Sequence, residues 1–210
     1  MARDSMLEAQ QLAAQRGSAT LFANVDFSLG NGEMLVVTGA NGSGKTTLLR
    51  IASGLSHAAH GALKWRGIAV APFDAELRAS VLYIGHATAL KDEFTAEENL
   101  LALASLHGAP GGERAAVREA LGAWSLDRQS RLPARVLSQG QRRRIALARL
   151  NLIRRPLWVL DEPASAIDAA GVAQLERLIA SHLSTGGIAV IATHHDLAIH
   201  AARKHILRLS

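Results

Sequence analysis

The chain contains no cysteine, and aromatic residues make up only 4% of its 210 residues. The missing cysteines exclude disulfide bonds, thiolate metal sites and cysteine nucleophiles, and they fit a reducing compartment. No apolar run approaches the roughly 18 residues that a membrane-spanning helix needs. The opening segment MARDSMLEAQ also lacks the apolar core of a secretory signal. We therefore expect a chain with no membrane span, which reaches a membrane only through a partner.

Positive charge is in excess, with 23 lysines and arginines against 18 acidic residues and a net charge of +5. Such a balance can indicate nucleic-acid or anionic-membrane binding. The arginines are scattered, however, and the sequence has no basic tail and no ladder of aromatic residues for base stacking. We therefore expect no nucleic-acid partner. The nine histidines are not grouped at metal-ligand spacing, so no zinc or iron site is expected.

Continuous apolar runs predict the strands of an α/β core. MLVVT at 34–38, LWVLDE at 157–162 and IAVIATHH at 188–195 are typical of strands buried on both faces. Residues 21–37 predict two short strands joined by a turn at Asn31-Gly32. Shorter strands are expected at 62–65 and 81–85.

Helices are predicted between these strands. One starts at about Lys45, and another starts at Thr95, where Thr95-Ala-Glu-Glu98 has capping-box spacing. The Gly- and Pro-rich segment 108–112 should end that helix. Further helices are expected at 113–124, 139–153 and 172–183. The alternation of strands and helices predicts the α/β class, with a helical block at 95–153 as a lobe.

A glycine-rich loop stands between the strand at 34–38 and the helix from Lys45. It matches G-x-x-x-x-G-K-[ST] at every fixed position, and its residues are Gly39, Ala40, Asn41, Gly42, Ser43, Gly44, Lys45, Thr46 and Thr47. Glycines let backbone N–H groups turn toward phosphate oxygens, and the helix N-terminus adds partial positive charge. Lys45 is expected along the β- and γ-phosphates, with the Thr46 hydroxyl on Mg²⁺. The alternative is an ordinary flexible turn.

Two carboxylates follow the buried strand LWVL. Asp161 stands at its exit and is expected to contact the Mg²⁺, usually through water. Because side chains alternate along a strand, Glu162 should point elsewhere and could activate a water on the γ-phosphate. A strand end with two solvated acids is the alternative.

A second predicted anion site lies far along the chain, at Leu137-Ser-Gln-Gly-Gln141. Ser138 can cap the Arg-rich helix that follows, and a helix N-terminus with serine and glycine attracts anions. One nucleotide does not need two phosphate sites from opposite lobes. The simplest solution is a head-to-tail dimer, in which each Ser138 meets the γ-phosphate held by Lys45 of the other chain.

These motifs occur in the order found in ATP-binding cassette (ABC) ATPases, together with Ser165-Ala-Ile-Asp168 and His194. The chain resembles that family over essentially its whole length. The resemblance implies a single P-loop NTPase domain over 1–210, with an antiparallel β subdomain and a helical subdomain at about 87–150. It implies a phosphate site formed by the glycine loop and Lys45, Asp161 for Mg²⁺, Glu162 as general base and His194 as γ-phosphate sensor.

The same resemblance implies an interface between two copies of the chain. Ser138 and Gly140 would contact the ATP of the partner, and Asp168 would lie at the dimer interface. The helical subdomain would touch a membrane partner.

Three positions depart from the general ABC pattern. Gln139 replaces a glycine, which is tolerable if its side chain points away. His86 replaces a glutamine that serves the Mg²⁺ site. It could hydrogen-bond water there and, unlike glutamine, gain a proton at slightly acid pH; otherwise it is a loop histidine. Arg16 stands where an aromatic residue should stack on adenine. A guanidinium can stack too, and the alternative is a solvated arginine.

Within the ABC family the chain resembles the ATP-binding subunits of the cytochrome c biogenesis (Ccm) haem exporters. The shared features are the short length, Lys64-Trp-Arg-Gly67, Gly85-His86, and the runs at 141–150, 168–172 and 193–195. The resemblance implies a homodimer docked on multispanning membrane subunits, peripheral at the cytoplasmic face of the bacterial inner membrane. Two alternatives remain open. One is an ABC motor for another cargo, and the other is a soluble ABC ATPase without transport.

Overall fold

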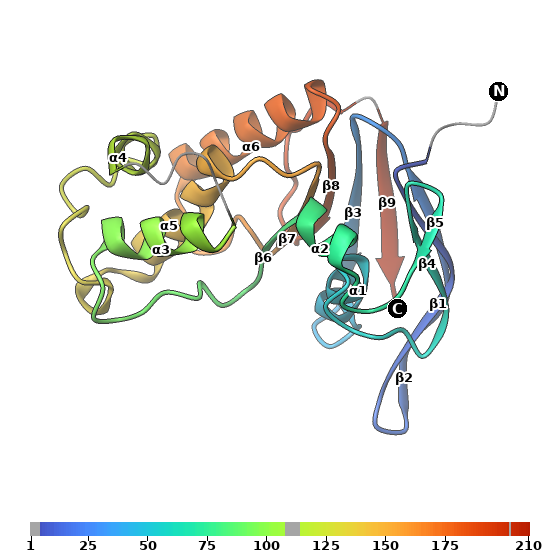
Figure 1. Ribbon diagram of the computed structural model, residues 1–210. Coiled ribbons are helices and arrows are strands. Elements are labelled where there is room, and N and C mark those ends of the chain that lie inside the picture. The colour runs from blue at the N-terminus through green and yellow to red at the C-terminus, as the bar shows by residue number, and fades with distance from the viewer. Residues whose placement is uncertain (1–4, 108–113, 202) are drawn as a thin grey trace. The chain divides into compact units, whose positions relative to one another are not determined.

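The structure is a computed structural model that describes residues 5–107, 114–201 and 203–210. The chain divides into two compact units. Unit 1 contains residues 1–83, 155–162 and 179–210, and unit 2 contains residues 84–154 and 163–178. Figure 1 labels the helices and strands of both units.

Unit 1 contains two sheets with α1 (Lys45–Ala52) packed against strands of both. Sheet A has the order β2-β1-β4-β5 and is antiparallel. Its strands are β1 (Leu7–Arg16), β2 (Ala19–Leu29), β4 (His60–Trp65) and β5 (Ile68–Val70). The short helix α2 (Ala75–Ser80) follows β5 and buries Leu77 in the same core.

Sheet B has the order β6-β7-β8-β3-β9, with β6 at one edge (Figure 1). Its strands are β3 (Glu33–Gly39), β6 (Val81–Ile84), β7 (Leu157–Asp161), β8 (Ile188–Ala192) and β9 (Arg203–Leu209). The pairs β7–β8, β8–β3 and β3–β9 are parallel. Every residue of β7 and β8 is buried, as the continuous apolar runs predict for strands covered on both faces.

Unit 2 is mainly helical. Its helices are α3 (Ala96–Leu106), α4 (Arg114–Gly122), α5 (Gln139–Leu152), the 3₁₀ turn Ala134–Val136 and the first part of α6 (Ala169–Ser184). The predicted capping box is confirmed, because the Glu98 N–H donates to Thr95 Oγ1 and the Thr95 N–H donates to Glu98 Oε2. The predicted break at 108–112 lies outside the described residues. Within the described part of the chain, no helix combines the length and apolarity needed to span a bilayer.

Several predicted boundaries are wrong. The strand at 188–195 ends at Ala192, so both histidines lie in the following loop. The helix predicted from Val172 begins at Ala169, where Asp168 accepts a hydrogen bond from the Gly171 N–H. The two strands predicted within 21–37 exist, but β2 and β3 belong to different sheets. The turn at Asn31-Gly32 therefore crosses between sheets instead of closing a hairpin.

Candidate functional site

The register of sheet B brings the ends of three strands together. Val37 of β3 and Asp161 of β7 both pair with Ala192 of β8. Because these strands are parallel, the segments that follow them all leave the sheet at the carboxyl ends of the strands. The glycine loop, Glu162 and His194 therefore start from neighbouring positions in unit 1, although they are far apart in the sequence.

The glycine loop adopts a conformation that side chains would oppose. Gly39, Gly42 and Gly44 have φ values of +147°, +87° and +94°, in the region that favours glycine. A Cβ at Gly39 would also lie 2.4 Å from the Leu209 carbonyl oxygen. At Gly44 it would lie 2.9 Å from the Phe22 ring. The loop is thus held closely between β2 and the end of β9, which argues against a merely flexible turn.

Lys45 begins α1 and turns back over the loop. It is 8% exposed, and its Nζ donates to the carbonyl oxygens of Gly39 at 2.8 Å and Ala40 at 3.1 Å. The Ser43 hydroxyl oxygen is buried and has no hydrogen-bond partner within the described chain. The loop therefore contains a buried cation, Lys45, and a hydroxyl without a hydrogen-bond partner, that of Ser43. Asn41 is exposed, and Thr47 is half-buried in α1.

Thr46 and Asp161 form the second part of the site. The Thr46 hydroxyl donates to Asp161 Oδ2 at 2.7 Å, and Asp161 is only 2% exposed. Tyr83 on β6 also belongs to this region. Its pKa is raised by burial and by the Asp161 carboxylate, while a hydrogen bond from Arg50 acts in the opposite direction. Tyr83 was not predicted as part of the site, and its only signal in the sequence is its place just before Gly85-His86.

Glu162 lies beyond the end of β7 in a strained conformation. Its φ is +47°, uncommon for a residue with a side chain. Its N–H donates to the Ala192 carbonyl at 2.8 Å. We predicted the direction of the Glu162 side chain from the alternation of side chains along a strand. That reason does not apply, because β7 ends at Asp161 and the left-handed backbone of Glu162 sets the direction instead. His194 meets it, with the His194 N–H and Nε2 each 3.4 Å from a Glu162 carboxylate oxygen.

Arg16 ends β1 and pairs with Ala19 across the tight β1–β2 turn. Its side chain is exposed. The same hairpin supplies Phe22, whose ring lies against Gly44. Arg16 therefore stands on the hairpin that packs against the glycine loop, and its stacking on adenine stays a prediction.

The remaining predicted residues lie in unit 2. Ser138 caps α5 in a full capping box, because its Oγ accepts from the Gln141 N–H while Gln141 Oε1 accepts from the Ser138 N–H. A Cβ at Gly140 would lie 2.5 Å from the Ala166 carbonyl oxygen, so a glycine is needed there for packing within one chain. His86 is exposed in the same unit.

Asp168 is held by contacts that the sequence did not predict. Arg144 Nη2 donates to its Oδ2 at 2.6 Å, and Arg144 Nη1 donates to the Trp124 carbonyl. The Gly171 N–H, and then Arg144, lower the pKa of the Asp168 carboxyl below its usual value. Arg144 thus links α5 to the segment Ser165–Asp168, and its position in a run of three arginines offers no signal of that contact.

The residues of unit 1 fit ATP and Mg²⁺. The positive-φ glycines hold the loop in a backbone conformation that side chains would oppose, Lys45 Nζ lies against the loop carbonyls of Gly39 and Ala40, and the buried Ser43 hydroxyl oxygen has no hydrogen-bond partner within the described chain. The Thr46 hydroxyl and the Asp161 carboxylate supply the oxygen ligands that Mg²⁺ prefers. Among the described residues no group of three or more His, Cys, Asp or Glu side chains could hold a metal by itself. A metal with substrate phosphates as ligands remains compatible with that finding.

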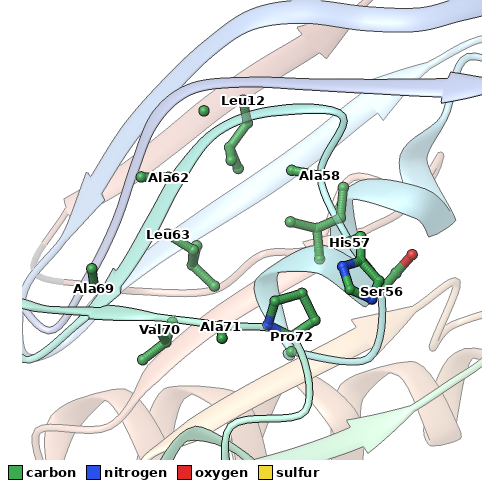
Figure 2. A pocket seen from close by; sticks show the side chains of 13 residues that line it. Leu12, Ser56, His57, Ala58, Ala62, Leu63, Ala69, Val70, Ala71 and Pro72 are labelled. Carbon is green, nitrogen blue, oxygen red and sulfur yellow. The ribbon is translucent and has the colours of Figure 1, made fainter.

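Two pockets of unit 1 differ in their relation to these residues. One of about 310 Å³ is lined by His194 itself, together with residues that include Val36, Thr38 and Leu197. The other, of about 220 Å³, lies between sheet A and the end of α1, where Leu12, Leu63, His57 and Pro72 line it (Figure 2). Its lining is largely apolar and includes no residue of the glycine loop.

Comparison with known proteins shows the family of this chain. The sequence model of the family described as ABC transporter matches residues 22–165. The cytochrome c biogenesis ATP-binding export protein CcmA 2 of Cupriavidus metallidurans is 45% identical over 200 residues, which cover 95% of this chain and 94% of that protein. The CcmA protein of Dechloromonas aromatica is 45% identical over 204 residues, covering 97% and 100% of the two chains.

Solved structures confirm the predicted fold class. The ATP-binding cassette MJ0796, in a dimeric post-hydrolysis state bound to ADP and Pi, matches with a TM-score of 0.77 and 26% identity over 90% of this chain and 88% of that one. Another dimeric structure of MJ0796, a bacterial ABC transporter cassette, matches with a TM-score of 0.79 and 25% identity over 97% and 94%. This chain belongs to the ABC transporter family and, within it, to the cytochrome c biogenesis ATP-binding export proteins.

Proposed function

We propose that this chain is the ATP-hydrolysing subunit of an exporter that serves the maturation of c-type cytochromes, with haem as its cargo. The observation that carries the proposal is the 45% identity to cytochrome c biogenesis ATP-binding export proteins across nearly their full length. The grouping of Lys45, Thr46, Asp161 and Glu162 at one edge of sheet B supports the ATPase chemistry.

The glycine loop and Lys45 bind the triphosphate in this proposal. Backbone N–H groups of residues 39–47 and the N-terminus of α1 face the phosphate oxygens. Lys45 exchanges its two carbonyl contacts for the β- and γ-phosphates. Arg16 stacks on the adenine base.

Thr46 and Asp161 hold Mg²⁺, which neutralises phosphate charge when it is bound. Thr46 contributes its hydroxyl oxygen, and the buried Asp161 contributes its carboxylate, directly or through water. His86 hydrogen-bonds water of the same site. Replacing His86 with glutamine tests this role, since an unchanged ATPase rate and pH profile would remove His86 from the site.

Glu162 acts as the general base for hydrolysis. Its carboxylate accepts a proton from the attacking water as the new bond forms at the γ-phosphorus, and the bond from that phosphorus to the β-phosphate oxygen breaks to release ADP. His194 senses the γ-phosphate. The 3.4 Å separations between His194 and Glu162 support their acting as a pair.

Two copies of the chain form a head-to-tail homodimer around two ATP molecules. Ser138 and Gly140, at the start of α5, contact the γ-phosphate held by the partner, and Asp168 lies at the interface. The exposed Ser138 hydroxyl and the helix N-terminus support an anion contact there. The dimeric state of the structural relative MJ0796 also supports this arrangement.

The homodimer works with multispanning membrane subunits at the cytoplasmic face of the bacterial inner membrane, where this chain is peripheral. Deleting its gene and staining cell extracts for covalently bound haem tests the cargo. We expect the haem signal of c-type cytochromes to disappear and to return with the wild-type gene, but not with Glu162→Gln. Normal staining after deletion would reject haem export and leave an ABC motor for another cargo.

A further inference from the structure

A buried arginine on α5 connects two loops of unit 2. Arg143 is 2% exposed. Its Nη1 donates to the Gly85 carbonyl at 2.7 Å, and its Nε reaches the Pro163 carbonyl at 3.4 Å. Burying a guanidinium is costly unless its N–H groups are hydrogen-bonded. The side chain is thus held in one place by backbone oxygens from two separate segments.

Both acceptors lie where the chain passes between the two units. The chain enters unit 2 at Ile84, one residue before Gly85, and enters it again at Pro163 itself. Gly85 precedes His86, and Pro163 follows Glu162. Arg143 therefore contacts the backbone next to two residues of the proposed site, from a helix whose N-cap is Ser138.

Glu162 needs an external restraint. Its φ of +47° is strained for a residue with a side chain. The following proline restricts it further, because a proline ring disfavours helical conformations in the residue before it. On its N-terminal side, the Glu162 N–H is held by the Ala192 carbonyl. On its C-terminal side, Arg143 contacts the carbonyl of the following residue, Pro163.

We propose that Arg143 is a positioning residue for ATP hydrolysis, which fixes the Pro163 and Gly85 carbonyls and thereby keeps the backbone of Glu162 in its strained conformation. A guanidinium suits this task, because its planar fork offers donors in several fixed directions, whereas a lysine offers one compact charge. The proposal rests on the general-base role of Glu162.

The test uses the purified full-length chain and MgATP. Arg143→Gln and Arg143→Lys are compared with the wild type in ATP affinity and in single-turnover hydrolysis at saturating ATP. We expect Arg143→Gln to lower the hydrolysis rate about 10- to 100-fold, as small misplacements of catalytic groups do. ATP affinity should stay within about twofold. Arg143→Lys should restore part of the rate, and it carries the test if the glutamine variant does not fold.

Arg142→Lys is the matched control. Arg142 is the neighbouring residue of the same helix, and it contacts Asp92 and the Ala134 carbonyl instead. The Arg142→Lys variant should hydrolyse ATP at the wild-type rate. An equal loss in Arg142→Lys, a parallel loss of ATP affinity, or a rate of Arg143→Gln within about twofold of wild type would each overturn the proposal.

A double-mutant cycle separates this proposal from the one on which it rests. If Arg143 acts through Glu162, adding Arg143→Gln to Glu162→Gln should cause no further loss of rate. If the double variant instead loses rate by the product of the two single losses, the positioning role is rejected while Glu162 remains the base. If Glu162→Gln alone hydrolyses ATP at the wild-type rate, the proposed function of Glu162 fails instead.

Discussion

The Thr46 hydroxyl donates a 2.7 Å hydrogen bond to Asp161 Oδ2, across a separation of 115 residues in the sequence. Thr46 lies in the first turn of α1, and Asp161 is the last residue of β7. The pair exists because β3 and β7 are each parallel to β8 and end at the same edge of the sheet. A neutral hydroxyl and a carboxylate thus meet at the first turn of α1, which directly follows the glycine loop.

Asp161→Asn should lower MgATP hydrolysis at least about 100-fold, which corresponds to about 2.7 kcal/mol of activation free energy. The amide keeps the size of the side chain but removes the negative charge that holds Mg²⁺. Steady-state phosphate release at a series of Mg²⁺ concentrations measures the effect. Asp196→Asn is the control, since Asp196 is fully exposed and paired only loosely with Lys204 at 3.8 Å. Equal rates in the two variants would contradict the role of Asp161.

Glu162→Gln should retain ATP and hold two chains together. Binding survives because the glycine loop and Lys45 are untouched, whereas the amide cannot accept the proton of the attacking water. Size-exclusion chromatography with MgATP should show a dimer that the wild type does not accumulate. Rapid turnover by this variant would refute the assignment of the base.

His194→Ala should slow hydrolysis about 10- to 100-fold, because it removes the group that approaches both Glu162 and the proposed γ-phosphate position. His195→Ala provides a neighbouring control, as the His195 N–H is bonded to Thr193 Oγ1 and its ring has no proposed role. Single-turnover rates of the two variants should therefore differ. A larger loss in His195→Ala would exchange the roles of the two histidines.

Ser138→Arg should spare ATP binding by the monomer and prevent dimer closure. Ser138 is exposed at the N-terminus of α5, so a long cation there would crowd the γ-phosphate of the partner in the proposed dimer, while the glycine loop itself is unchanged. Introducing the same change into Glu162→Gln makes the loss of the trapped dimer measurable by light scattering. Ser181→Arg, on the exposed side of α6, should leave the dimer intact. A closed Ser138→Arg dimer would argue against the head-to-tail site.

His182 should make unfolding stability depend on pH. Its ring stacks on Trp158, with 3.9 Å between ring centroids and 1° between planes, and its Nε2 lies 3.1 Å from the Ile188 carbonyl. Burial lowers the pKa of His182 below its ordinary value of 6.5, although hydrogen bonds to the carbonyls of Ile188 and Pro156 oppose this. The unfolded chain therefore binds the proton first as the pH falls.

The stabilising contribution of neutral His182 is complete above pH 6.5 and declines as the pH falls below that value. The free energy of unfolding, from urea titrations at about pH 7.5 and about pH 5.5, should thus fall further in the wild type than in His182→Phe. The phenylalanine keeps the stacking on Trp158, and all other titrating groups are common to both proteins. Equal pH dependence would rule out this role of His182.

Local features of the structure followed from local sequence. The capping boxes at Thr95 and Ser138 depend on residues three positions apart, so their spacing is visible in the chain. The buried strands β7 and β8 were recognisable for a similar reason, because burial on both faces demands a continuous apolar run. In contrast, β1 was missed. Its sequence LEAQQLAAQR does not alternate, since register shifts interrupt its pairing with β2 and β4.

The features of the candidate site also divide into those visible in the sequence and those decided by the tertiary structure. The chain by itself predicted the glycine loop, Asp161 and Glu162, because phosphate and magnesium chemistry needs those residue types, whereas His194 was predicted only through the resemblance to ABC ATPases. Only the tertiary structure decided the Thr46–Asp161 contact, the left-handed turn of Glu162 and the burial of Arg143 beneath Gly85 and Pro163. Those features depend on the packing of strands and helices that are far apart in the sequence. The contacts of Arg143 leave no pattern either, because a backbone carbonyl accepts a hydrogen bond whatever its side chain is. No residue pattern along the chain could therefore have predicted these three features.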